Sequence, residues 1–168
     1  MQFKEIKTEE FDAVYKQMEE NFPVCEIRLK EEARAVLSQK DYFLYHIEED
    51  GRNVGFISVW NLNGFCFIEH FVIYLNFRNK GLGQIALDLA KRKWKRLVLE
   101  AEPSDTELAS RRLGFYKRNG FFQNSFKYMQ PAYREGEEGV ELVILSYPDL
   151  LDEGKDTVKE IYKRVYGR

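Results

Sequence analysis

Alternation of hydrophobic and polar positions in the middle of the chain predicts an antiparallel meander. The pattern marks three strand-like runs, which cover residues 42–48, 54–62 and 65–74. They are separated by Asp50-Gly51 and Asn63-Gly64, dipeptides that favour the tight two-residue turns of β-hairpins. We therefore expect three consecutive strands, each paired with its neighbour along the chain.

The part of the chain before this meander predicts one short strand and two helices. Phe3 and Ile6 indicate the strand, and Thr8 is placed to cap a helix that runs to about Asn21. A second, strongly charged helix is expected over residues 30–38. The predicted order is thus strand, helix, helix and then the meander.

The period of the hydrophobic pattern changes after the third meander strand. Hydrophobic residues from Leu82 to Trp94 follow helical spacing, and residues 96–101 again indicate a strand. A strand, helix, strand unit places its two strands in parallel through a right-handed crossover. One parallel junction is therefore expected inside an otherwise antiparallel sheet.

The next part of the chain predicts a helix and a pair of strands. Ser104 and Glu107 have the spacing of a capping box for a helix that Asn119-Gly120 would end. Residues 121–129 and 140–147 indicate an antiparallel pair of strands, joined by a polar loop. These strands would complete the sheet.

The length of the chain fits a single domain of the α+β class. The 168 residues contain no linker and no internal repeat, so residues 1–168 are expected to form one unit. A final amphipathic helix, expected over residues 156–166, would extend this unit by packing on its own sheet or on another subunit, which leaves a homodimer open. The predicted architecture is a mixed, mostly antiparallel sheet flanked by helices, with one parallel strand junction.

The charge balance favours no large polyanionic partner. The 26 Lys and Arg residues oppose 28 Asp and Glu residues, which gives a net charge of -2. No whole-molecule field would therefore attract nucleic acid or an anionic membrane. Cys25 and Cys66 have neither the spacing nor the histidine neighbours of a zinc site, and no metal is expected. Without an apolar run of membrane-spanning length or a signal-peptide pattern, the expected location is the cytoplasm.

A glycine-containing loop joins the third meander strand to the helix that follows. The loop consists of Arg78, Asn79, Lys80, Gly81, Leu82, Gly83 and Gln84. Gly81 and Gly83 let a ligand approach the backbone, and the unpaired N–H groups of a helix N-terminus bind phosphate. Arg78 and Lys80 would add positive charge. The loop therefore predicts a pyrophosphate site; a plain tight turn and an ATP site are the alternatives.

This loop and a segment downstream resemble the GNAT superfamily of acetyl-CoA-dependent N-acetyltransferases. The loop follows the acyl-CoA motif R/Q-x-x-G-x-G/A, and the downstream segment follows the pattern around a family tyrosine. The matching residues are Arg78, Gly81 and Gly83 in the first and Tyr116, Gly120 and Phe121 in the second. Leu75, Ala109 and Arg112 stand where the family often has Pro, Asn and Ala. The resemblance covers about residues 42–147 and implies the GNAT fold and acetyl-CoA as cosubstrate.

The resemblance implies direct attack of an amine on the thioester of acetyl-CoA in a ternary complex. It assigns Tyr116 as the acid that protonates the departing thiolate, which suits a phenol that is protonated at neutral pH. It favours Glu69 as the base, while His70, Glu100 and the absence of any protein base stay open. Because side chains alternate along a strand, Glu69 and His70 are expected on opposite faces.

The resemblance also indicates how the two substrates would be held. Backbone N–H groups around Phe71, Val72 and Ile73 would stabilise the oxyanion, and the same backbone would pair with the pantetheine arm. The first two helices and the loop 130–139 would form the acceptor wall. Its acidic residues, which would suit a cationic amine or else form a solvated surface, are Glu9, Glu10, Glu19, Glu20, Glu26, Glu135, Glu137 and Glu138. Further candidates for lining this cleft are Tyr128, Tyr133 and Tyr147.

The sequence thus predicts an enzyme, an N-acetyltransferase that acts on a primary amine of a small molecule or a peptide. A catalytically silent acyl-CoA-binding domain with a regulatory role is the alternative, because the base is not identified and Ala109 replaces a frequent asparagine. Release of free CoA thiol in the presence of amines separates the two readings.

Overall fold

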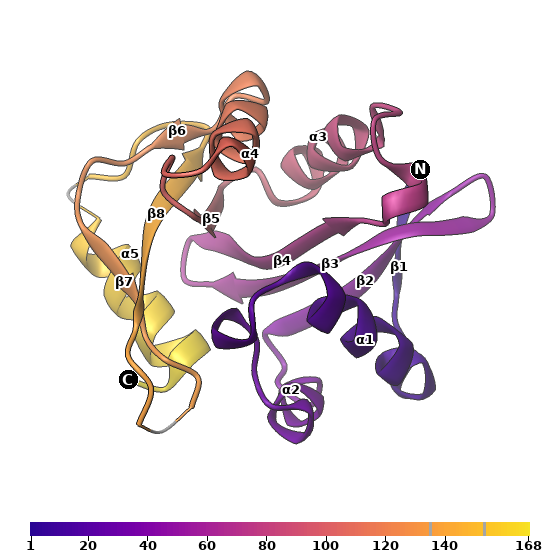
Figure 1. The fold of residues 1–168 in the computed structure, drawn as a ribbon, viewed down its shortest axis with the longest axis horizontal. Helices are drawn as coiled ribbons and strands as arrows, with labels where there is room; N and C mark the ends of the chain where they lie inside the picture. Colours follow the sequence, from indigo (N-terminus) through magenta and orange to yellow (C-terminus); the bar gives the residue numbers. More distant parts are fainter. Residues whose placement is uncertain (135, 153) are drawn as a thin grey trace.

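A mixed sheet of eight strands runs through the whole protein, in the order β1-β2-β3-β4-β5-β8-β6, with β7 paired to β8 (Figure 1). The computed structural model describes residues 1–134, 136–152 and 154–168. The strands are β1 (Gln2–Glu5), β2 (Tyr42–Glu49), β3 (Arg52–Leu62), β4 (Phe65–Ile73), β5 (Leu97–Ala101), β6 (Phe122–Gln123), β7 (Tyr128–Gln130) and β8 (Val140–Tyr147). The helices are α1 (Phe11–Asn21), α2 (Lys30–Val36), α3 (Leu82–Trp94), α4 (Glu107–Arg118) and α5 (Lys155–Ile161). The short turns are η1 (Thr8–Glu10), η2 (Val24–Glu26), η3 (Leu75–Phe77) and the π-helical turn η4 (Tyr162–Tyr166).

The expected meander is confirmed, because β2, β3 and β4 pair antiparallel in chain order. Asp50 and Gly51 both adopt positive φ, at 49° and 73°, as a type I′ hairpin turn requires. In the second turn only Gly64 has a positive φ, of 84°. The parallel pairing of β4 with β5 is confirmed as well.

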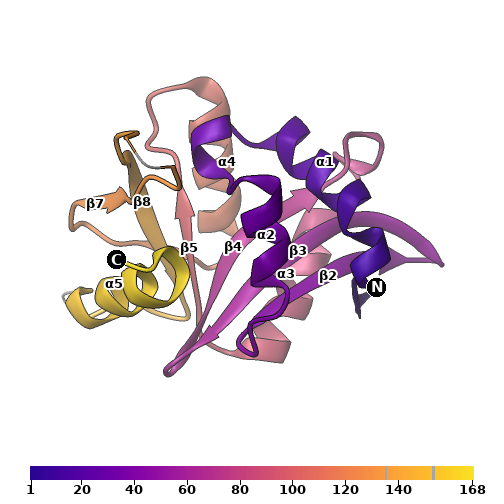
Figure 2. The same cartoon turned by 90° about the horizontal axis from the view of Figure 1, so that it is seen from below.

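Helices cover both faces of the sheet and form two separate cores (Figures 1 and 2). On one face, α1 and α5 pack on the meander with fully buried residues such as Phe11 and Ile161. On the other face, α3 and α4 bury Leu87 and Leu113 against the strands. Burial of each large aliphatic or aromatic side chain contributes about 1.5–3 kcal/mol, so both cores stabilise the packing of the helices on the sheet.

The parallel junction is short, and the two strands part beyond it. Pairing between β4 and β5 runs from Cys66 opposite Leu97 to Ile68 opposite Leu99. Past this point β4 continues to Ile73 while pairing only with β3. Alternate residues of a strand direct their backbone groups to opposite neighbours, so part of the β4 backbone faces the gap instead of another strand.

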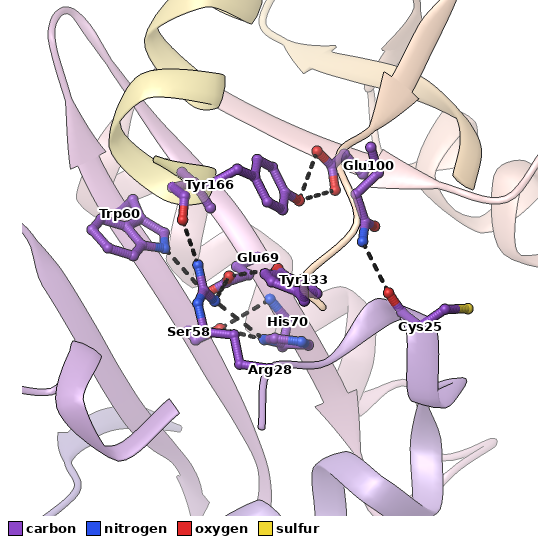
Figure 3. A network of polar contacts seen from close by, with 11 residues as sticks. Cys25, Arg28, Ser58, Trp60, Glu69, His70, Glu100, Tyr133 and Tyr166 are labelled. Carbon is purple, nitrogen blue, oxygen red and sulfur yellow. Dashed lines mark hydrogen bonds and ion pairs between the residues drawn. The ribbon is translucent and has the colours of Figure 1, made fainter. Parts of the chain in front are cut away.

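A β-bulge in β4 corrects the expectation that Glu69 and His70 lie on opposite faces. Ser58 of β3 pairs with His70, whereas its neighbour Val59 pairs with Ile68, so Glu69 is an extra residue on β4. An extra residue interrupts the alternation of side chains. Glu69 and His70 therefore lie side by side, with Oε2 and Nδ1 4.0 Å apart (Figure 3).

The predicted strand over residues 121–129 is wrong, because this segment forms two short strands on β8. Strand β6 pairs with the C-terminal half of β8 and β7 with its N-terminal half. Asn124 causes the interruption: its amide Nδ2 donates to the carbonyl of Ile144 and to the Ser146 hydroxyl, and its Oδ1 accepts from Leu151 N–H. Such side-chain bonds compete with the backbone ladder.

Two predicted helix caps also differ from the structure. Helix α4 is capped by Thr106, whose hydroxyl accepts from the N–H of Ala109 at 3.1 Å, so the Ser104 and Glu107 capping box is wrong. Thr8 begins the turn η1 and caps no helix. The helix end at Asn119-Gly120 is confirmed, since Gly120 has a φ of 82°.

The final helix packs on its own sheet. Ile161 of α5 and Val165 of η4 are buried in the same core as α1. The helical region consists of α5 and the π-helical turn, in place of one continuous α-helix. Within the described ranges of the chain, no helix is long and apolar enough to cross a membrane.

Candidate active site

A cavity of about 790 Å³ opens where β4 and β5 part. It extends from the loop before α3 to the β7–β8 connection, and α4 forms one of its walls. Most residues predicted for cosubstrate binding line it: Phe71, Val72, Ile73, Arg78, Asn79, Gly81, Leu82, Gly83 and Gln84. Lys80 lies outside this lining, because its ammonium donates to the carbonyl of Asn76 at 3.0 Å.

The loop before α3 has the geometry of an anion site. Gly81 precedes the helix with a φ of 75°, a left-handed conformation that glycine adopts without strain. Within the part of the chain that the structure describes, no acceptor pairs with the backbone N–H groups of residues 79–83. These groups and the helix dipole are available to a pyrophosphate. The residues present therefore fit the phosphate end of acetyl-CoA.

Gly83 leaves the space through which a ligand reaches this helix start. A Cβ atom at Gly83 would lie 3.2 Å from Cζ of Phe115 and 3.7 Å from Cγ1 of Ile73. A larger side chain would fill this space between α3, α4 and β4. The glycine is therefore needed for close approach at this helix start, and its φ is not unusual.

Arg78 connects the loop to β4 and α1 through two hydrogen bonds. Its Nε donates to the carbonyl of Ile73 at 2.9 Å, and its Nη2 donates to Oδ1 of Asn21 at 2.6 Å. The guanidinium thus links the end of β4 to the end of α1 and keeps its charge beside the loop. This contact combines a positioning role with the positive charge expected from the sequence.

Tyr116 lies on α4 with its ring in the cavity wall. The side chain packs edge-on against Phe115 and Phe121, with ring centroids 5.4 and 5.7 Å away. Burial raises the pKa of the Tyr116 phenol to about 12, so it stays protonated at neutral pH. Among the described residues its hydroxyl has no hydrogen-bond partner, which leaves the proton available to a ligand in the cavity.

The side chain of Glu69 is buried, and both of its carboxylate oxygens accept hydrogen bonds (Figure 3). Its Oε1 accepts from Arg28 and from the Tyr133 hydroxyl at 2.9 Å, and its Oε2 accepts from Trp60 Nε1 at 3.1 Å. Burial by itself would raise the pKa of Glu69, but the Arg28 guanidinium and the hydrogen bonds outweigh it and hold this pKa below its usual value. Glu69 is therefore a fixed, ionised carboxylate.

Arg28, which the sequence did not single out, is the hub of this network. It lies between η2 and α2, and its Nη2 donates to the carbonyl of Val165 at 2.6 Å. Its guanidinium lies 4.6 Å from the ring centroid of Tyr133 and 5.8 Å from that of Trp60. In the sequence Arg28 is a single charged residue before Leu29, and nothing there indicates its partners. One of them, Val165, lies 137 positions further along the chain.

His70, the second candidate base, is buried beside Glu69. Its Nδ1 lies 3.1 Å from the Ser58 hydroxyl, and its ring packs edge-on against Phe22 at 4.7 Å. Burial lowers the pKa of His70, with Glu69 acting in the opposite direction. The imidazole is therefore neutral at physiological pH.

Glu100, the third candidate base, has a different environment. It lines the cavity and accepts hydrogen bonds from the hydroxyl of Tyr166 (Figure 3) and from that of Tyr128, with no cationic partner among the described residues. Burial raises the pKa of Glu100 to about 7, although both hydroxyls act to lower it. Glu100 can therefore both hold and release a proton near neutral pH.

The acidic residues that line the cavity differ from most of those expected for an acceptor wall. Of the predicted acidic residues in the described ranges, only Glu26 lines the cavity; Glu135 lies outside those ranges. Glu69, Glu100 and Glu102 complete the acidic lining. Tyr133 also lines the cavity, Tyr128 contacts Glu100, and Tyr147 packs near Phe121 at a distance from this wall. The described residues contain no group of His, Cys, Asp and Glu that could hold a metal ion.

An unpaired helix start beside a parted pair of parallel strands is the arrangement that an acyl-CoA-dependent acyltransferase requires. Comparison with known sequences agrees: the profile of the Acetyltransferase (GNAT) family matches residues 4–121. The chain belongs to this GNAT acetyltransferase family and is an enzyme that transfers acetyl groups from acetyl-CoA. The alternatives of an ATP site and of a catalytically silent domain find no support in this assignment.

Relatives span nearly the whole chain. YjbC of Bacillus subtilis (strain 168), described as a candidate acetyltransferase, is 26% identical over 155 residues, which cover 90% of this chain and 78% of YjbC. A candidate GNAT acetyltransferase structure from Bacteroides thetaiotaomicron is 32% identical with a TM-score of 0.89, and the match covers 100% of this chain and 99% of that one. Arabidopsis thaliana NAA60, solved in complex with acetyl-CoA, shares the fold with a TM-score of 0.64 at 12% identity, over 87% of this chain and 97% of NAA60.

Proposed function

We propose that this enzyme is an N-acetyltransferase that acetylates a cationic primary amine by direct attack in a ternary complex. The observation that carries the proposal is that the phosphate-binding loop, the Tyr116 phenol and the Glu100 carboxylate all line one cavity. A bound thioester and an amine can therefore meet without leaving it. The acceptor is a small molecule or a peptide with a free amine.

In this proposal the cosubstrate lies along β4. The N–H groups of residues 79–83 bind the pyrophosphate, and backbone groups of Phe71, Val72 and Ile73 pair with the pantetheine arm. The same backbone donates to the oxyanion that forms when the amine attacks the acyl carbon. Tyr116 donates its proton to the departing thiolate, which its high pKa permits at neutral pH.

Glu100 is the carboxylate that we assign to proton removal from the ammonium. A base works best with a pKa near the operating pH, and the pKa of Glu100 is raised to about 7. Glu69, the base favoured by the sequence, has a lowered pKa and already accepts from Arg28, Trp60 and Tyr133. Its role as base stays a prediction, which the experiment below separates from the assignment to Glu100.

The acidic lining supports a cationic acceptor. Glu26, Glu69, Glu100 and Glu102 line the cavity, and within the described residues Glu69 forms an ion pair with Arg28 and Glu102 with Arg112. The carboxylates of this lining that are ionised attract an ammonium group to the side of the cavity where it must be deprotonated.

The experiment measures release of free CoA thiol from acetyl-CoA with a panel of polyamines, aminoglycosides and peptides with free N-termini. We expect at least one cationic amine to give thiol release above the buffer rate, with an acid limb of kcat/KM near pH 7 because Glu100 must be ionised. Glu100→Gln should lower kcat/KM by roughly 10²-fold and abolish this limb.

Glu69→Gln is the matched control for this experiment. If Glu69→Gln keeps the acid limb of kcat/KM and Glu100→Gln loses it, the base is Glu100. If Glu69→Gln loses the limb and Glu100→Gln keeps it, the base is Glu69, which the sequence favoured. Binding of acetyl-CoA without thiol release for the whole panel would contradict the proposed reaction.

A further inference from the structure

The segment formed by α5 and η4 packs in the core and also contacts a residue that lines the cavity. It follows the residues that match the family profile, which end at 121. Its backbone accepts from Arg28 at the carbonyl of Val165, and Tyr162 donates its hydroxyl to the carbonyl of Met129. Buried Ile161 anchors it in the core. The segment is therefore firmly held beside the acceptor end of the cavity.

Tyr166 is the residue of this segment that reaches the reacting groups (Figure 3). Its hydroxyl lies 2.8 Å from Oε2 and 3.1 Å from Oε1 of Glu100. Its ring packs against Tyr133, with the centroids 5.2 Å apart. In the described part of the chain, Tyr166 is the only donor to Oε2, because Tyr128 donates to Oε1.

We propose that Tyr166 is a positioning residue for acetyl transfer, whose hydroxyl holds the Glu100 carboxylate ionised and oriented toward the acceptor amine. The proposal rests on the proposed function, in which Glu100 removes the proton. It assigns to a segment outside the matched family region an influence on the chemistry that acts through Glu100.

The charge on Glu100 is set by groups from four elements. The hydroxyls of Tyr128, on β7, and Tyr166, on η4, donate to the carboxylate and favour its ionised form. The carboxylates of Glu69, on β4, and Glu26, on η2, repel it and favour the protonated form, in addition to burial. Removal of one of the two donors should therefore raise the pKa of Glu100.

The test compares Tyr166→Phe with Tyr162→Phe. Each variant removes one tyrosine hydroxyl from the π-helical turn η4. Tyr162 donates to the carbonyl of Met129 and, within the described residues, makes no hydrogen bond to Glu100. For Tyr166→Phe we expect the acid limb of kcat/KM to move up by about one pH unit, because a hydrogen bond to a charged group is lost. At pH 6 this corresponds to a loss of about tenfold, with unchanged affinity for acetyl-CoA. Tyr162→Phe should leave the limb in place.

A double variant separates a positioning role from a merely structural one. Because Tyr166 acts through Glu100, adding Tyr166→Phe to Glu100→Gln should change kcat/KM by less than twofold. A full tenfold loss in the double variant, or an unmoved limb in Tyr166→Phe, would overturn the inference while the assignment of Glu100 stands. A limb that persists in Glu100→Gln would instead remove the proposed base, and the inference with it.

Discussion

Glu69 and Glu100 line the same cavity but have opposite pKa shifts, because their partners differ. A guanidinium, an indole N–H and a phenol surround Glu69, so its pKa is lowered against the effect of burial. Within the described part of the chain, the donors to Glu100 are phenols, and burial raises its pKa. Two carboxylates whose pKa values are pushed apart can take different roles, one structural and one in proton transfer.

Replacing Tyr116 tests the second proton transfer of the proposed reaction, from the phenol to the departing thiolate. Tyr116→Phe removes the hydroxyl but keeps the ring contacts with Phe115 and Phe121. We expect kcat to fall by roughly 10²-fold, since general acid catalysis contributes about that much, with little change in the dissociation constant of acetyl-CoA. Steady-state kinetics and calorimetric binding measure the two quantities. Wild-type turnover would remove Tyr116 from the reaction.

Individual residues could be predicted where a local motif carries them. Tyr116, Gly81 and Gly83 lie in the cavity lining, and the sequence could point to them because each belongs to a motif of near neighbours in the chain. The common side of Glu69 and His70 could not be predicted, since the β-bulge depends on pairing with Ser58 on another strand. Arg28 was missed for the same reason, because its partners come from β4 and η4.

Among the elements, the junction of the loop and α3 has the clearest testable role. Gly83→Val places side-chain atoms in the space next to Phe115 and Ile73, at the start of the helix. We expect affinity for acetyl-CoA to fall by at least tenfold, measured by calorimetry. The matched control is Gly114→Val on α4, where a Cβ would approach only the flexible end of Arg118, at 3.0 Å. If Gly83→Val and Gly114→Val bound acetyl-CoA with equal affinity, the loop would not be the pyrophosphate site.

Most elements followed from periodicity, while their ends depended on bonds that the sequence does not specify. The meander, α3 and β8 lie where the hydrophobic pattern put them. Helix α4 has two candidate caps within three positions, Ser104 and Thr106, and only the second reaches an N–H group. The break between β6 and β7 depends on Asn124, whose partners lie on β8 and beyond.

For the molecule as a whole, the raised pKa of Glu100 lowers stability where the enzyme works. A folded-state pKa of about 7, above the ordinary 4.5, gives stability that is present at acid pH and lost as the pH rises through 7. Glu100→Gln removes this loss. Its free energy of unfolding, relative to the natural chain, should therefore rise by about 2 kcal/mol between pH 5 and pH 8.

Urea denaturation at the two pH values measures this difference. Glu102→Gln is the control, because Glu102 is partly exposed and paired with Arg112. A difference between Glu100→Gln and the natural chain that stays the same at both pH values would show that Glu100 has no raised pKa in the folded protein.

The parting of β4 and β5 creates a strand edge in the interior of the sheet. Outer edges such as β1 are accessible to strands of other proteins, whereas this one lies between two halves of a single sheet. Another protein strand brings side chains on both of its faces and does not fit into such a slot. A narrow, extended ligand chain with amide groups does fit. The architecture therefore favours binding of an extended small molecule over strand-to-strand association with another protein.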